Sequence, residues 1–231
     1  MTLAYGQAHR TFLQEAVPDI QRLIDLHTSE TGAGPGRRRT DIQVVTRSAI
    51  VMTCASWEAF CEDLASEALR KIAIRTKDPA DLPAEIKKTL KRSLLAEKDD
   101  LAIWSIAGRG WKDQLKLRAD MMVSDEDRSL NTPKHRQVKA FFRENVGIGD
   151  ITQCWSWVRC QPDTACRKLD EFVALRGSIA HRRAPAGSVY KREAVNSLDL
   201  VQRLASCTAK QVDEFLAKTT GRGLIRRHIN A

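Results

Sequence analysis

The chain has 231 residues, of which 42% are hydrophobic, and a formal net charge of +9, so it can bury a sizeable core. This composition excludes long disordered stretches, and no run approaches the ~18 consecutive apolar residues of a membrane span. Because the first residues, MTLAYGQAHRTF, lack the apolar core of a signal peptide, we expect a cytoplasmic protein with no membrane partner.

Cations outnumber acidic residues, with 38 Lys and Arg against 29 Asp and Glu, and 24 of the cations are arginine. Such an excess favours a polyanionic partner such as nucleic acid, because Lys and Arg neutralise phosphates and release counterions. Arginine is the better planar ligand for phosphate.

The six cysteines show no CxxC spacing, and no histidine lies at zinc-finger distance from a cysteine pair. Cys54 and Cys61 are seven residues apart, on one face of an expected helix. We interpret the cysteines as small buried thiols in a reducing compartment, and we predict no metal, no other cofactor and no structural disulfide.

The N-terminal part of the chain predicts two long helices. Apolar residues with a period of 3.6 indicate the first, from about 3 to 28, and the stretch TGAGPGRRRT ends it. A second helix is expected from about 41 to 76. Its core stripe recurs at steps of four and three residues, at Ile50, Cys54, Trp57, Cys61, Leu64, Ala68 and Ile72.

The segment 77–160 is less regular and predicts a helical insert. Its shorter helices are expected near 83–97, 110–122, 134–144 and 150–157. Four tryptophans should anchor this segment to the core, namely Trp104, Trp111, Trp155 and Trp157.

Two further long helices follow the insert. One begins near residue 162, with Asp163 or Thr164 as its N-cap, and the last runs from about 189 to 218. The basic end, 219–231, predicts a loose tail. The fold class is therefore all-α. A single domain over 1–218 forms a bundle of two long N-terminal and two long C-terminal helices that carries the insert.

The stretch LRGSIAHRRAPAG contains Arg176 and His181 at the end of the third long helix. The apolar stripe of that helix includes Leu169, Phe172 and Ala180, and position 176 lies on it. A cation there should not face bulk water, and it cannot stay buried without a partner. We therefore expect Arg176 to meet a carboxylate, a helix end or a cleft that receives an anion.

Arginine and histidine also occur at similar spacing elsewhere, as chance predicts for so arginine-rich a chain. Three rival pairs have four to six intervening residues: Arg22–His27, Arg128–His135 and Arg222–His228. The first arginine lies off its helix's apolar stripe, beside carboxylates. The other two pairs lie in a polar loop and in the tail. Because catalytic groups need rigid placement, Arg176 and His181 are the preferred pair.

The spacing of this pair raises a geometric question. On an ideal helix, position 181 lies about 140° around the axis from position 176, since each residue turns about 100°. One straight helix would not aim both side chains at the same atom. Either the helix distorts near Gly177, a weak helix former, or the cleft is assembled from two copies of the chain. Ser178, one turn before His181, could hold its imidazole.

Two stretches resemble a known family. LRGSIAHRR resembles the R-x4-6-H signature of HEPN domains, small all-α ribonuclease and nucleotide-handling modules of prokaryotic conflict systems. RSAIVMTCASWEAFCEDL, residues 47–64, resembles the long early helix of RiboL-PSP-type HEPN proteins, with Trp57–Glu58 as an aromatic–Glu pair. The resemblance covers roughly 41–76 and 162–216. It departs at Gly177, where the family often has Asn, Asp or His.

The resemblance implies a metal-independent endoribonuclease, a toxin or defence effector that acts as a two-fold homodimer with both motifs in one cleft. Arg176 and His181 would be the catalytic pair, and an antitoxin or a neighbouring defence protein would be a partner. The chemistry agrees, because histidine exchanges protons near neutral pH and arginine stabilises a phosphorane. RNA would be cleaved by its own 2′-OH to give 2′,3′-cyclic phosphate and 5′-OH ends.

Further residues could serve this chemistry, and each has a simpler alternative. Glu58 could pair with Arg176 and orient it, or it could be an ordinary surface acid. The cations after the motif could track the RNA backbone, or they could be solvated helix-end charges: Arg182, Arg183, Lys191 and Arg192. A non-catalytic module of the same fold, which binds RNA or a partner protein, is the alternative to a nuclease.

Overall fold

The computed structural model describes four stretches of the chain: 4–31, 43–124, 130–181 and 189–225. The first expected helix is continuous but changes its winding, because a π-helical turn, η1 (Phe12–Ala16), joins α1 (Gly6–Thr11) to α2 (Val17–Thr31). Pro18 accounts for this turn, since a proline has no N–H to donate and its ring crowds the carbonyl four residues earlier.

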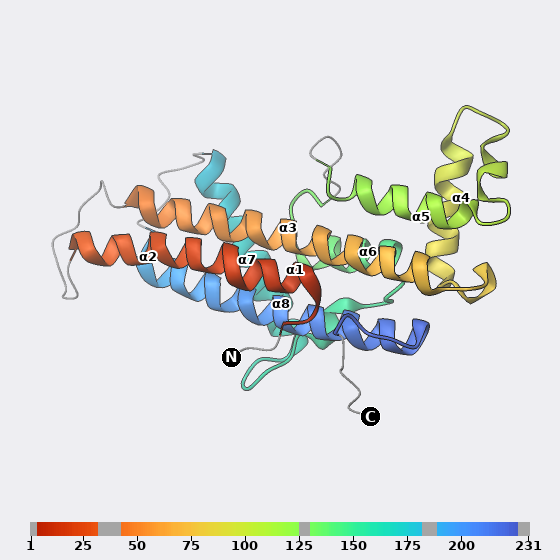
Figure 1. Cartoon of the computed structure of the whole chain (residues 1–231). Helices are drawn as coiled ribbons and strands as arrows, with labels where there is room; N and C mark the ends of the chain where they lie inside the picture. Colours follow the sequence, from red (N-terminus) through yellow and green to blue (C-terminus); the bar gives the residue numbers. More distant parts are fainter. Residues whose placement is uncertain (1–3, 32–42, 125–129, 182–188, 226–231) are drawn as a thin grey trace, which may run out of the picture.

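α3 (Gln43–Arg75) is the central helix of the fold. It packs against α1, α2, α5, α6, α7 and α8. Figure 1 shows α2, α3 and α8 (Lys191–Thr220) running alongside one another. The stripe predicted for 41–76 is confirmed, since none of its seven residues is more than 1% exposed. Small residues such as Ala65 and Ala73 are also fully buried and let neighbouring helices approach α3 on several sides.

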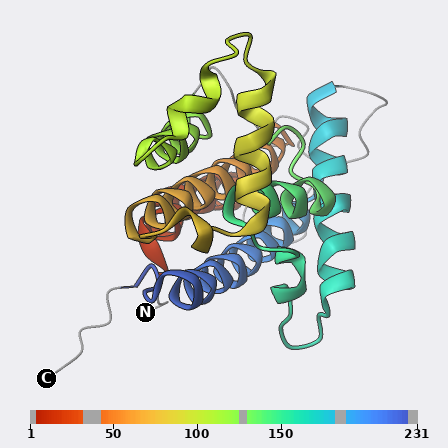
Figure 2. The same cartoon turned by 90° about the vertical axis from the view of Figure 1, so that its right-hand side faces the viewer.

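The insert is helical, as the sequence predicts. Its helices are α4 (Ala84–Ala96), α5 (Gly110–Met121) and α6 (His135–Val146), and its short 3-10 helices are η3 (Pro79–Asp81), η4 (Ala102–Ile106) and η5 (Ile151–Cys154). α5 and α6 pack on α3, and α4 packs on α6 (Figure 2).

The last expected helix of the insert, at 150–157, is only a short 3-10 helix. Asp150 caps it by accepting the backbone N–H of Thr152 at 3.0 Å. The chain then turns back in an isolated antiparallel bridge between Trp157 and Cys160. The reason is that Trp155 is drawn into the core, where its indole N–H donates to the Thr208 hydroxyl at 2.9 Å.

The predicted tryptophan anchors are confirmed only in part. Trp155 and Trp111 are 0% and 4% exposed, and Trp157 is half-buried. The expectation for Trp104 is wrong, because its side chain is 70% exposed. It belongs to η4, which packs against the core through Ala102 and Ile106 instead.

α7 (Pro162–His181) and α8 form the predicted C-terminal pair. The N-cap prediction of Asp163 or Thr164 is wrong, because the helix already begins at Pro162 and the carbonyl of Gln161 accepts the N–H of Ala165 at 3.0 Å. A proline at the first helical position has the required φ and lacks only an N–H that would be unpaired there.

The predicted loose tail is held in place over its first residues. Leu224 is buried, and the N–H of Ile225 donates to Asp213 Oδ1 on α8 at 2.9 Å. Arg75, the last residue of α3, donates to the carbonyl of Gly223 at 3.2 Å. The remainder, 226–231, lies outside the described residues.

Candidate active site

Arg176 lies near the C-terminal end of α7, at the boundary between core and solvent. The stripe predicted for this helix holds at Leu169 and Phe172, which are buried, but Ala180 is exposed. The Arg176 side chain is half-buried, and its Nε–H is buried with no hydrogen-bond partner in the part of the chain that the structure describes. Because a buried unpaired donor costs about 1–3 kcal/mol, an incoming acceptor would be stabilised there.

The Cys54 thiol shows which part of α3 lies close to Arg176. Burial raises the pKa of Cys54 to about 11, while the positive charge of Arg176 lowers this pKa and the Glu58 carboxylate raises it. Both charges therefore lie near the same buried thiol, at the contact between α3 and α7. Glu58 is half-buried, one turn after Cys54. This placement agrees with the expected neighbourhood of Glu58 and Arg176, and their direct pairing stays a prediction.

On α3, a second arginine has a buried Nε–H, and this arginine lies outside the R-x4-6-H motif. Arg47 precedes Cys54 by seven residues, or about two turns, so the two share one face of α3. Its Nη2 donates to Gln43 Oε1 at 3.2 Å, but its Nε–H is buried with no partner among the described residues. The signal that could have identified Arg47 is its register with Cys54 and Glu58, at steps of seven and four.

α7 remains α-helical from Pro162 to His181, including Gly177. The expected distortion at Gly177, one of the two alternatives, is therefore not found, and the offset of about 140° between positions 176 and 181 is kept. The Ser178 hydroxyl donates to the carbonyl of Leu175 at 2.7 Å. The hydroxyl oxygen can therefore accept a hydrogen bond from an imidazole, but its proton is already donated.

Two of the four predicted RNA-binding cations can be placed. Lys191 and Arg192 form the first turn of α8, which is capped by the Glu193 carboxylate accepting the Tyr190 N–H at 2.7 Å. The Arg192 side chain is exposed, and that of Lys191 is half-buried. The other two, Arg182 and Arg183, lie outside the described residues, as does the side chain of His181.

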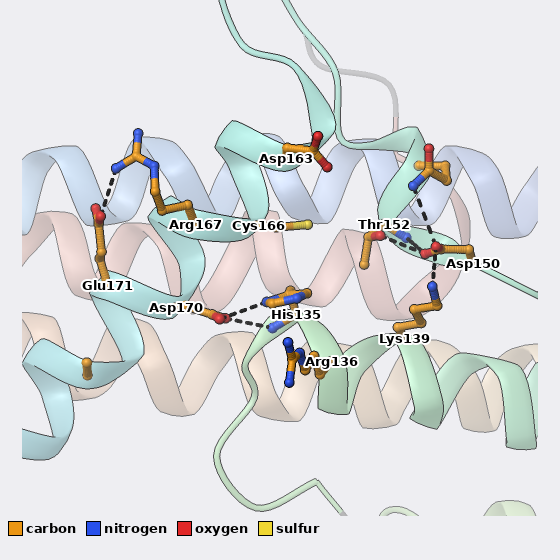
Figure 3. Close-up of a pocket in the computed structure, with 12 residues that line it drawn as sticks. His135, Arg136, Lys139, Asp150, Thr152, Asp163, Cys166, Arg167, Asp170 and Glu171 are labelled. Atoms are coloured by element: carbon orange, nitrogen blue, oxygen red, sulfur yellow. Dashed lines mark hydrogen bonds and ion pairs between the residues drawn. The ribbon is translucent and has the colours of Figure 1, made fainter.

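A separate cavity of about 690 Å³ lies between α6 and α7 (Figure 3). His135, the first residue of α6, donates its backbone N–H to Asp170 Oδ1 at 2.9 Å, and its Nδ1 lies 2.7 Å from Asp170 Oδ2. The expectation that this histidine lies in a loop without rigid placement is wrong. Its partner Asp170, on α7, holds both its backbone and its ring. Arg128, its partner in the rival motif, lies outside the described residues.

The cations around this cavity are mostly paired with carboxylates. Lys139 Nζ lies 2.5 Å from Asp150 Oδ2, and Arg167 Nη1 lies 2.7 Å from Glu171 Oε1. Burial raises the pKa of Asp150, but hydrogen bonds from Lys139 and Thr152 outweigh burial and lower it overall. Among the described residues, no group of three or more His, Cys, Asp or Glu could hold a metal ion.

Burial makes the thiols of five cysteines less acidic by raising their pKa: Cys54, Cys61, Cys154, Cys166 and Cys207. All six cysteines lie within the described residues and are free thiols. Burial raises the pKa of Cys154 to about 12, and it raises that of Cys61 well above its ordinary value. Since the thiolate is the nucleophilic form, thiols with a raised pKa are poor nucleophiles, and they pack in the core or against it as small apolar groups.

A protein-family model described as RiboL-PSP-HEPN matches residues 12–214. The matched span contains α3, the whole insert and α7. Comparisons with curated proteins and with solved structures give no match. Within the described residues, every helix is too short or too polar to cross a membrane.

Proposed function

The chain belongs to the RiboL-PSP-HEPN family, and on this premise we propose that it is a metal-independent endoribonuclease. The observation that carries the proposal is the buried Nε–H of Arg176, unpartnered among the described residues, at a helix contact that also holds Glu58. A guanidinium held between helices presents its planar donors to a phosphate in a fixed geometry.

In the proposed reaction, His181 takes the proton of the ribose 2′-OH, and the resulting oxygen attacks the adjacent phosphorus. Arg176 stabilises the extra negative charge of the phosphorane. The bond to the 5′ oxygen then breaks, and this oxygen receives a proton from the imidazolium. The products are a 2′,3′-cyclic phosphate and a 5′-OH. General acid–base catalysis of this kind contributes about 10²–10⁴-fold.

Two copies of the chain would form the active site. An unbroken α7 keeps positions 176 and 181 about 140° apart around the helix axis, so Arg176 of one copy would work with His181 of the other. Glu58 would orient Arg176. Arg182, Arg183, Lys191 and Arg192 would contact the RNA backbone on either side of the cleft.

The wider role is a further part of the proposal. Residues 1–218 would form one domain that includes the 77–160 insert, and the protein would act in the cytoplasm as a toxin or defence effector. An uncontrolled ribonuclease harms its own cell, so an antitoxin or a neighbouring defence protein would restrain it.

The decisive experiment is an RNA cleavage assay in EDTA with the wild type, Arg176→Ala and His181→Ala. We expect the wild type to cut and both variants to lose at least about 100-fold in rate. Mass spectrometry of the fragments should find cyclic phosphate ends. Cleavage that survives both substitutions would reject the catalytic assignment.

One observation favours a second candidate, a non-catalytic module that binds RNA or a partner protein. Gly177 follows the motif arginine, and no described residue fills the space where a side chain would be. A polar group that could help to orient Arg176 is therefore missing from this position. Wild-type protein that binds RNA but leaves it intact would favour this candidate.

A further inference from the structure

A basic groove of about 910 Å³ lies between α4 and α6, in the insert that the R-x4-6-H motif does not reach. Six cations and two acids line it, which gives a local charge of +4 within a chain of net charge +9. The cations are Lys88, Lys91, Arg92, Arg136, Lys139 and Arg143. The acids are Glu85 and Glu144.

The two acids of the groove, together with Asp150 of the neighbouring cavity, which pairs with Lys139 at 2.5 Å, leave part of this positive charge uncompensated. Glu85 lies 2.9 Å from Lys88 and 3.3 Å from Arg143, and Glu144 lies 3.6 Å from Arg92. The cations of these pairs are 52–66% exposed at their side chains, and such surface ion pairs are worth only about 0–1 kcal/mol, so a phosphate can replace the acids. Lys91 and Arg136 are exposed and take part in no ion pair among the described residues.

The walls of the groove are rigid. α4 buries Ile86, Leu90 and Leu94, and α6 buries Val138 and Phe142, so each helix has its apolar face in the core. The charged side chains therefore start from fixed backbone positions, which a binding site requires.

The rest of the lining indicates what the groove can recognise. Its apolar residues are Leu95, which is 69% exposed, and Ala140. Among the described residues, no aromatic side chain lines it, so they offer no platform on which bases could stack. Contacts would go to the sugar–phosphate backbone, which carries charge but no sequence information.

The groove continues toward α7. Arg136 and Lys139 line both the groove and the cavity of Figure 3. His135, next to Arg136 in the chain, is hydrogen-bonded to Asp170 on α7. Asp170 precedes Arg176 by six residues. The cavity itself also carries Asp150, Asp163, Asp170 and Glu171. These carboxylates would repel phosphates, so the inferred site is limited to the groove.

We infer that the α4–α6 groove binds the phosphate backbone of single-stranded RNA without sequence preference and holds the substrate beside the helix that carries the motif. The choice of RNA as the occupant rests on the proposed function, whereas the polyanion site itself rests on the groove.

The test measures binding to a 2′-O-methyl RNA, which cannot be cleaved because it has no free 2′-OH. Fluorescence anisotropy compares full-length wild type with Lys91→Gln/Arg136→Gln over a series of salt concentrations. Each lost phosphate contact lowers the slope of log K against log salt by about 0.7. The double variant should therefore lose about 1.4 in slope and bind about tenfold more weakly near 0.15 M salt.

The matched control is Arg10→Gln/Lys218→Gln. These two side chains are also exposed and line neither the groove nor the cavity of Figure 3. The two substitutions remove the same total charge as the groove variant. If the groove variant binds no more weakly than this control, the groove proposal is overturned. Groove-dependent binding to anionic lipid vesicles without RNA binding would also overturn it.

Cleavage of ordinary RNA is measured in parallel, so that the two proposals can fail separately. Groove-dependent binding by a wild type that never cleaves would support the groove and reject the nuclease. Cleavage by the wild type, with binding indifferent to Lys91 and Arg136, would reject the groove alone.

Discussion

Lysine in place of Arg176 would keep the positive charge and lose the planar fork of donors. If the Nε–H of Arg176 donates a hydrogen bond to the phosphorane, Arg176→Lys should lower the cleavage rate by about 10²–10³-fold. Thermal stability should hold or rise, because the buried donor without a described partner is removed. Single-turnover cleavage and a melting curve measure the two effects.

The control for this substitution is Arg167→Lys on the same helix. Arg167 is 63% exposed at its side chain and pairs with Glu171, so its replacement should change neither rate nor stability appreciably. An Arg176→Lys protein that cleaves at the wild-type rate would contradict a specific role for the guanidinium.

His9 makes the stability of the fold depend on pH. It is 0% exposed, and burial lowers its pKa to about 4. Its Nδ1 accepts the Tyr5 N–H at 3.1 Å, which requires an unprotonated nitrogen. The unfolded histidine has a pKa of about 6.5, so the unfolded chain binds the extra proton between these values. The contribution of His9 is therefore complete above about pH 6.5 and is lost as pH falls toward 4.

The expected result is a melting temperature that drops faster below pH 6.5 in the wild type than in His9→Gln. Each kcal/mol lost shifts the midpoint by about 2–4 °C in a chain of this size. The same carboxylates titrate in both proteins, so their effect on the melting temperature cancels in the comparison. Parallel curves for the two proteins would show that His9 does not titrate in this window.

At the scale of elements, two glycines should respond to alanine with opposite signs. Gly177 lies within α7, and among the described residues no atom outside its own helix backbone lies within 4 Å of the place its Cβ would take. Gly177→Ala should stabilise the protein by about 0.5–1 kcal/mol, because alanine loses less backbone entropy in a helix.

Gly147 ends α6 with a φ of +89°, and an added Cβ would lie 2.5 Å from Pro83 Cβ. Gly147→Ala should therefore destabilise the protein by more than about 1 kcal/mol. Urea unfolding followed by circular dichroism measures both variants. A destabilised Gly177→Ala would mean that the end of α7 has contacts beyond the described residues.

Local periodicity predicted the elements that bury one continuous stripe, and it failed where a distant residue decides the structure. α3 was predictable because Cys54, Trp57 and Cys61 recur at helical spacing. Arg176 was identified in the same way, as a cation on an apolar stripe. The rigid placement of His135 was not predictable, because it depends on Asp170, 35 residues further along the chain. The exposure of Trp104 likewise depends on how η4 packs.

On the scale of the whole molecule, α3 joins the two proposed functional regions. Its 33 residues span about 50 Å. Cys54 and Glu58 lie on the part of α3 that is close to Arg176 of α7. The insert packs on α3 through α5 and α6. RNA held in the α4–α6 groove and RNA cut near α7 would thus be positioned by one rigid helix.

The proposed composite cleft can be tested by mixing two inactive proteins. A heterodimer of Arg176→Ala with His181→Ala has one intact arginine and one intact histidine, and they belong to different copies. If catalysis joins the two across the two-fold axis, random mixing should recover about a quarter of the wild-type rate, since half of the dimers are mixed and each has one complete site. Each variant alone is the control, and light scattering after gel filtration verifies that dimers form. If every active site used the arginine and histidine of one copy, mixing would recover nothing. The unbroken α7, which holds the two positions about 140° apart, favours recovery.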